Sequence, residues 1–327
     1  MMDGIIIQRM NMTTTPSPTT TAQTSVLNGV ALLTHLGIIK VEGEDAAKFI
    51  HGQLTQDFSL LDQNTARLAA FCSPKGRMLA SFIGFKRSNS EIWLICSRDV
   101  LAPTLKRLSM FVMRAKARLS DVTQEHAIYG LAGDAAKVIA DQSYSTWAKH
   151  DFHGCTLVNL PSADAMRRQL WVAPLAEPAP AGTDLPLSVW QWGDVRSGVA
   201  TLTAPVVEAF VPQMLNYESV GGVNFKKGCY PGQEVVARSQ FRGTLKRRAF
   251  VAHADAEMAA GVEIFSATDA TQPVATVVQA APAPGGGFDA IISGQLSAID
   301  QGAIHLGSST GPILNILTLP YPLLEDI

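Results

Sequence analysis

After Gly243 the chain consists of short alternating apolar runs separated by clusters of glycine and proline, and this pattern limits the possible fold most strongly. Runs of this length and spacing are typical of a small all-β barrel or sandwich. We therefore expect a β-barrel over residues 244–327. Its predicted strands are Ala249–Ala252, Val262–Phe265, Val274–Val278, Ala290–Ile292, Ile304–Leu306 and Ile313–Leu319.

The segment before Gly243 mixes helical and strand periodicities, which favours an α+β region. A proline-rich run at 174–186 predicts a long loop, because proline suits neither a helix interior nor a central strand. The predicted strands are Val30–Val41, Leu68–Phe71, Leu79–Phe85, Glu91–Cys96, Ala117–Val122 and Ala127–Leu131. One predicted helix begins near Glu42. Others cover Leu101–Val112, Ala135–Ala140 and Leu187–Ser197.

Length, charge and cysteine usage exclude several classes of protein. A chain of 327 residues is too long to fold around a single small core. Its net charge of −2 argues against a protein that coats nucleic acid by bulk charge. The four cysteines lack metal-ligand spacing, so we expect no intrinsic metal. No apolar run is long enough to span a bilayer, and residues 1–25 lack a leader pattern, so we expect a cytoplasmic protein with a flexible N-terminal tail.

The segment richest in candidate functional residues is Phe-Lys-Lys-Gly-Cys-Tyr-Pro-Gly-Gln-Glu at 225–234. Pro231 predicts a helix that begins just after Cys229, and Gly243 predicts its end. A cysteine beside a helix N-terminus and two lysines is in an environment that stabilises a thiolate. The alternative is that Cys229 is a small buried hydrophobic residue, and no partner histidine can be identified from the sequence.

Basic residues gather around this run against a single acid, Glu234. They predict a local anion site for the glutamyl tail of a folate or for RNA phosphate, although a solvated helix face remains the alternative. No RNA-binding motif is present, so we do not expect direct RNA binding. The basic residues are Lys226, Lys227, Arg238, Arg242, Lys246, Arg247 and Arg248.

The string Lys-Gly-Cys-Tyr-Pro-Gly-Gln-Glu at 227–234 resembles the signature of the YgfZ family. The likeness includes Phe210–Gln213, Gly221–Gly222 and Phe241–Gly243, and it extends to Phe49–Asp57, Phe71–Met78 and Leu319–Tyr321. It covers most of residues 28–322, although residues 125–185 match only in the order of their predicted elements and not in their residues.

This resemblance implies a three-part architecture like that of the aminomethyltransferase of the glycine cleavage system (GcvT), with antiparallel sheets flanked by helices and a C-terminal all-β barrel. Residues 26–243 are then a folate-binding region made of two subdomains that we expect to be discontinuous in sequence. The implied cofactor is tetrahydrofolate or a derivative. The implied functional residues are Cys229 as the working thiol with Lys227, and for the cofactor Gln53, Asp57, Asp194, Arg196, Lys226, Tyr230, Gln233, Glu234 and Arg238.

Two departures from the related transferases bear on the activity. An aspartate pair of the aminomethyltransferase aligns with Ala80 and Ser81, so the acid expected at the reacting centre is absent. A pterin-binding glutamate aligns with Arg196, which leaves Asp194 as the candidate replacement. The resemblance implies an accessory protein for the maturation or repair of iron–sulfur enzymes, including those of tRNA modification, and the two departures favour this role over a transferase. Its partners would be folate and iron–sulfur enzymes or assembly proteins. The alternative is a folate-dependent aminomethyl transferase.

Overall fold

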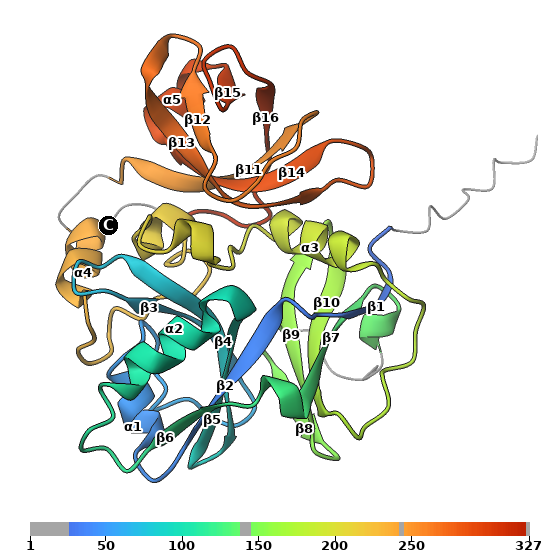
Figure 1. The fold of residues 1–327 in the computed structure, drawn as a ribbon, viewed down its shortest axis with the longest axis vertical. Coiled ribbons are helices and arrows are strands. Elements are labelled where there is room, and N and C mark those ends of the chain that lie inside the picture. The colour runs from blue at the N-terminus through green and yellow to red at the C-terminus, as the bar shows by residue number, and fades with distance from the viewer. Residues whose placement is uncertain (1–25, 138–144, 242–244, 325–327) are drawn as a thin grey trace, which may run out of the picture.

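The computed structural model describes residues 26–137, 145–241 and 245–324. Two five-stranded antiparallel sheets lie side by side, and a closed barrel sits above them (Figure 1). This arrangement confirms the predicted α+β class and the C-terminal barrel. None of the helices in the described ranges combines the length and apolar character needed to cross a membrane.

The strands pair with antiparallel neighbours throughout all three sheets. The first sheet has the order β3 (Ala66–Cys72), β4 (Met78–Ser88), β5 (Glu91–Ser97), β2 (Leu36–Glu42) and β6 (Arg118–Asp121). The second has the order β1 (Gly29–Leu32), β7 (His126–Ala132), β10 (Met166–Pro174), β9 (Cys155–Ala163) and β8 (Lys149–Phe152). The barrel has the order β11 (Arg247–Ala254), β14 (Phe288–Gln295), β13 (Asp269–Pro282), β12 (Glu263–Ser266), β15 (Ile304–Leu306) and β16 (Ile313–Leu317).

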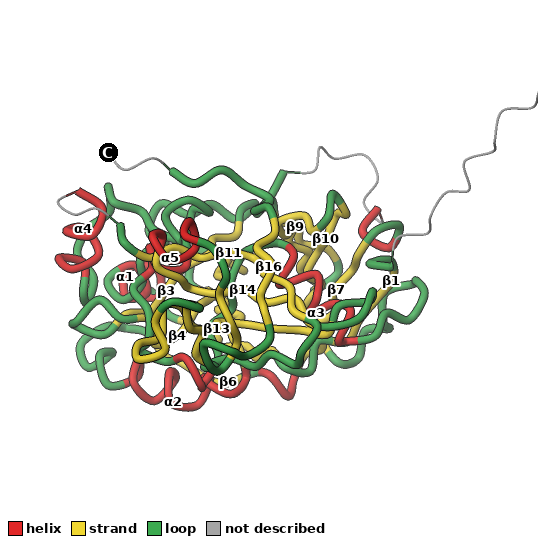
Figure 2. The backbone as a smooth tube through the Cα atoms, turned by 90° about the horizontal axis from the view of Figure 1, so that it is seen from above, coloured by secondary structure: helices red, strands yellow, loops and turns green. Residues whose placement is uncertain are grey.

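The α-helices of the described residues are α1 (Ala46–His51), α2 (Arg98–Ser109), α3 (Leu187–Arg196), α4 (Gln233–Phe241) and α5 (Leu296–Gln301). The helices α1 and α2 pack on one face of the first sheet, whereas α3 lies between the second sheet and the barrel. Short 3-10 turns occur at Thr123–Glu125, Ala135–Lys137, Ala204–Val206 and Pro212–Leu215. In both views α4 lies at the left edge of the molecule, and α3 lies to the right of its middle (Figures 1 and 2).

The first sheet is buried on both faces, which explains its almost continuous apolar strands. Successive residues of β2 point to opposite sides, so Ile38 packs with the second sheet and Ile39 packs with α1 and α2. Trp190 of α3 belongs to the core between the sheets. Leu202 and Tyr217 belong to a third core, which joins the first sheet to the barrel.

Two sequence predictions are wrong about local structure. The single strand predicted from Val30 to Val41 is two strands, β1 and β2, which belong to different sheets and are separated by a turn at 33–35. The helix α4 begins at Gln233, not with Pro231 just after Cys229. Gly232 has a φ of +81° and packs against the carbonyl of Ser73, so this tertiary contact replaces the first predicted turn of the helix.

Other differences are smaller. The predicted helix at Ala135–Ala140 is a 3-10 turn at Ala135–Lys137, and its remainder lies outside the described residues. The helix predicted at Leu101–Val112 starts at Arg98 and ends at Ser109. The short helix α5 was not predicted. The tail at 1–25, Arg242 and the helix end predicted at Gly243 also fall outside the described residues.

Candidate functional site

The Gln53–Asp57 segment and the loop before Cys229 are held together by hydrogen bonds between residues that are far apart in the sequence. Thr55 Oγ1 donates to the carbonyl of Gly222 at 2.6 Å, and the amide of Asn224 donates to the carbonyl of Thr55 at 2.9 Å. Gln56 Nε2 donates to the carbonyl of Gly221 at 2.5 Å. The structure therefore brings two segments of the sequence signature into one place.

Lys227 is buried and fastens the cysteine loop to the end of α1. Its Nζ donates to the carbonyl oxygens of His51 and, at 2.8 Å, of Leu54. The same ammonium lies 4.7 Å from the centre of the Tyr230 ring, which is a cation–π contact. Burial lowers the pKa of Lys227 to about 8, while the charges of Asp57 and Cys229 oppose this shift.

Cys229 is exposed, which rules out the alternative of a small buried hydrophobic residue, whereas Cys72, Cys96 and Cys155 are buried. His51 Nδ1 lies 3.0 Å from Asp57 Oδ1. Burial favours the neutral acid of Asp57, but hydrogen bonds from the Leu60 amide and His51 lower its pKa below the usual value. We call the group of Cys229, Lys227, Tyr230, His51 and Asp57 the thiol site.

The other predicted residues of this region differ in how far their side chains are exposed to solvent. Gln53 is partly buried, and its side-chain oxygen has no hydrogen-bond partner among the described residues. Lys226 is exposed, and Gln233 is partly buried at the start of α4. Glu234 and Arg238 form an exposed ion pair of 2.9 Å one helical turn apart. Such a pair contributes little to stability, and neither residue is buried by a neighbouring element.

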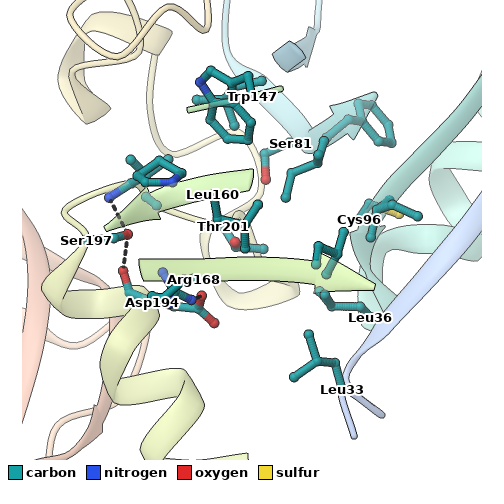
Figure 3. Close-up of a pocket in the computed structure, with 18 of the residues that line it drawn as sticks. Leu33, Leu36, Ser81, Cys96, Trp147, Leu160, Arg168, Asp194, Ser197 and Thr201 are labelled. Carbon is teal, nitrogen blue, oxygen red and sulfur yellow. Dashed lines mark hydrogen bonds and ion pairs between the residues drawn. The ribbon is translucent and has the colours of Figure 1, made fainter. Parts of the chain in front are cut away.

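A central cavity lies between the two sheets and α3, away from the thiol site (Figure 3). Its volume is about 60 Å³, or about 610 Å³ when the open space around it is included, and its walls are mainly apolar. The polar side chains in its lining are Ser81, Arg168, Asp194, Ser197 and Thr201. The sequence prediction included Asp194 but missed Arg168 and Ser197.

Arg168 and Asp194 form an ion pair at this cavity, and Arg168 is 1% exposed. The Arg168 guanidinium also lies 4.3 Å from the centre of the Trp190 ring, on the same helix as Asp194. A carboxylate offers about four lone-pair sites, so Asp194 can accept further hydrogen bonds from a ligand. Nothing in the local sequence marks Arg168, because a charged residue in a strand is normally expected to face water.

Arg196 lies at a second opening that shares part of its wall with the central cavity. Trp147, Pro161, Ser197 and Val199 line both spaces. The guanidinium of Arg196 is 2.7 Å from Asp164 Oδ1 and 3.6 Å from Asp289 Oδ2. Two carboxylates therefore already balance its charge.

The positions that correspond to the transferase acids are buried and already packed. Ala80 is 0% exposed in β4. Ser81 Oγ accepts a hydrogen bond of 2.8 Å from the amide of Leu202. Of the described residues in the lining of the central cavity, Asp194 carries the one carboxylate.

Comparison with known proteins assigns the family. Residues 20–166 match the model of the GCVT N-terminal domain. An uncharacterized protein of Haemophilus influenzae is 30% identical over 227 residues, which are 67% of this chain and 71% of that protein. The tRNA-modifying protein YgfZ of Hamiltonella defensa is 29% identical, covering 67% and 68%, and that of Colwellia psychrerythraea is 29% identical, covering 69% and 71%. The chain belongs to the YgfZ family.

A solved structure supports the same fold for this YgfZ-family chain. The crystal structure of the glycine cleavage system aminomethyltransferase T from Bartonella henselae superimposes with a TM-score of 0.68, covering 92% of this chain and 88% of that one. The sequence identity is 13%, so this likeness concerns the fold alone. The predicted GcvT-like architecture is confirmed.

Proposed function

We propose that this protein binds a reduced folate in the central cavity and acts as an accessory factor for the maturation or repair of iron–sulfur enzymes. The observation that carries the folate proposal is Asp194, a carboxylate in a mainly apolar cavity between the sheets. A pterin ring has flat apolar faces and an edge of amino and ring N–H donors. A carboxylate among apolar walls suits both features of the ring.

Arg168 supports this assignment by holding the Asp194 carboxylate in position through their ion pair. Hydrogen bonds to a charged carboxylate are among the strongest in proteins. Ser197 continues the same wall and donates to the carbonyl of Asp194 at 2.7 Å. These residues would bind and orient the ring, while the one-carbon chemistry belongs to the folate itself.

The glutamyl tail of the folate would leave through the opening beside Arg196. The two spaces share part of their wall, which places this opening next to the cavity. Because Asp164 and Asp289 already pair with Arg196, a tail carboxylate must compete with them for the guanidinium. We therefore propose that the ring, and not the tail, supplies most of the binding free energy.

Cys229 is the working thiol of the proposal, with Lys227 as its positioning residue. The thiol is exposed, and the buried ammonium beside it fixes the loop that carries it. An exposed thiol away from the folate cavity suits contact with a protein partner better than chemistry on the folate. The named YgfZ relatives are tRNA-modifying proteins, which favours iron–sulfur enzymes of tRNA modification as the partners.

The experiment is complementation in cells that lack their own YgfZ-family protein. The readouts are the activity of an iron–sulfur enzyme and the level of a tRNA nucleoside that such an enzyme makes. We expect Cys229→Ala and Asp194→Asn to lower both readouts, and the control Cys155→Ala, which changes a buried thiol, to restore both. Full restoration by Cys229→Ala, at wild-type protein levels, would contradict the thiol role.

A further inference from the structure

A groove separates α4 from the barrel at one end of the molecule. Its volume is about 1710 Å³ when the space open to solvent is included. Figure 1 shows α4 at the edge of the first sheet, below the barrel, where these elements face each other. Its lining, which we call the basic groove, consists of Val211, Met214, Arg238, Ser239, Leu245, Lys246, Arg247, Gln295, Leu296 and Ser297.

Three cations from two different elements converge on the basic groove. Arg238 comes from α4, and Lys246 and Arg247 come from the start of the barrel. Glu234 pairs with Arg238, but this pair is exposed to solvent. In the part of the chain that the structure describes, neither Lys246 nor Arg247 has a carboxylate within 4.0 Å.

Arg247 is the member that points most clearly to an anionic ligand. Its guanidinium is partly buried and makes only long contacts, of 3.5 Å to the carbonyl of Ser293 and 3.4 Å to that of Pro273. Burial lowers the pKa of Arg247 because a desolvated cation without a counter-ion is destabilised. An anion in the groove would supply the missing counter-charge.

The structure also separates this groove from the other basic residues near it in the sequence. Lys227 is turned into the thiol site, and Arg248 forms a buried ion pair with Glu218. Met214, Leu245 and Leu296 contribute apolar side chains to the same lining. The groove therefore combines positive charges with apolar side chains.

We propose that the basic groove binds the sugar–phosphate backbone of a single-stranded RNA segment. Phosphates repeat along a strand, so one strand can meet several cations at once, whereas a free phosphate meets one. The apolar patches offer surfaces against which bases or riboses can pack. No RNA-binding motif in the sequence predicts this function, and the proposal does not depend on folate binding.

The test is fluorescence anisotropy of the full-length protein with a labelled single-stranded RNA of about 12 nucleotides at several salt concentrations. Single-strand contacts contribute about −0.7 each to the slope of log K against log salt, so three contacts predict a slope of about −2. Lys246→Glu and Arg247→Gln should each weaken binding and reduce the steepness of the slope by about 0.7 or more. Lys137→Glu reverses an exposed charge that pairs with Asp134 outside the groove and should leave the slope unchanged.

Two competitors distinguish the alternatives. Inorganic phosphate at matched ionic strength should displace the RNA poorly, and an acidic peptide of equal charge should bind more weakly than the RNA. Displacement by millimolar phosphate would assign the groove to a small phosphate compound. Equal binding of the peptide, no RNA binding at low salt, or equal effects of Lys246→Glu and Lys137→Glu would each overturn the proposal.

Discussion

The ammonium of Lys227 donates a 2.8 Å hydrogen bond to the carbonyl oxygen of Leu54, a residue 173 positions earlier in the chain. The carbonyl oxygens at the end of a helix have no partner within the helix, and Lys227 supplies a donor to this region after α1. The contact fixes the loop that carries Cys229 against the N-terminal part of the protein. The lysine of the sequence signature therefore has a structural role that its position beside a cysteine does not reveal.

Replacing Lys227 by methionine should destabilise the protein, because the carbonyls of His51 and Leu54 would be left without their donor. The expected loss is about 1–3 kcal/mol of unfolding free energy. Lys226→Met changes the exposed neighbour and should have an effect within about 0.5 kcal/mol. Urea denaturation of the three proteins measures both values, and equal stabilities would contradict the role of Lys227.

The stability difference between wild type and Lys227→Met should depend on pH. The pKa of Lys227 is lowered from 10.5 to about 8 in the folded protein, so between these values the unfolded chain binds more protons. Wild-type stability relative to the variant should therefore rise from pH 8 toward pH 10, by at most about 1.4 kcal/mol per unit. Denaturation at pH 7, 8, 9 and about 10 tests the sign, and a constant or falling difference would contradict the lowered pKa.

Cys229 should react with iodoacetamide in the folded protein well before the other three cysteines. Burial raises the pKa of Cys72 to about 12, and burial also raises the pKa values of Cys96 and Cys155. Peptide mass spectrometry after brief labelling should find the label at Cys229, and Cys229→Ala should remain almost unlabelled. Labelling of Cys72 at the same rate as Cys229 would show that the region around β3 opens.

Gly130→Ala should destabilise the core between the two sheets. A methyl group at Gly130 would overlap the Trp190 ring of α3, and overpacking of this kind costs about 1–3 kcal/mol. Gly285→Ala is the control, because nothing lies within 4 Å of an added carbon there. Thermal denaturation should separate the two variants by several degrees, and equal midpoints would be inconsistent with the packing of α3 against β7.

Many regular elements could be predicted from the sequence, but the strands β8, β9 and β10 and the helix α5 could not, and neither could the assignment of strands to sheets. The strands around Leu79 and Glu91 were evident because apolar runs end at turn residues. The division of Val30–Val41 into two sheets is marked only by the polar pair Thr34 and His35, which does not show that the two apolar strands belong to different sheets. The start of α4 was misplaced because the contact of Gly232 with Ser73 joins residues that are far apart in the sequence.

The same limit applies to the candidate site. The signature predicted Cys229 and Lys227, and Asp194 was found through its position near Arg196. His51 was missed as a partner for Asp57 because a lone histidine has no distinctive local pattern. Arg168 was missed because only the folded structure shows that its strand position faces Asp194 and not water.

The protein should not release methylenetetrahydrofolate from an aminomethylated carrier at a useful rate. A positioned acid or base contributes about 10²–10⁴-fold to such a reaction, and neither buried Ala80 nor hydrogen-bonded Ser81 supplies one. A coupled assay with lipoylated carrier protein, ammonia and methylenetetrahydrofolate measures the reverse of this step, which the same groups would catalyse. Turnover close to that of an aminomethyltransferase would favour the alternative function.

The most direct test of the account is calorimetric titration of the wild-type protein with tetrahydrofolate, alongside Asp194→Asn and the control Tyr129→Phe. We predict saturable binding of one ligand per chain. Loss of a charged hydrogen bond costs about 1.5–3 kcal/mol, so Asp194→Asn should weaken binding about 10- to 100-fold, while Tyr129→Phe should bind as wild type does. Absence of binding to the wild-type protein, or equal affinity in Asp194→Asn, would contradict a folate site at the central cavity.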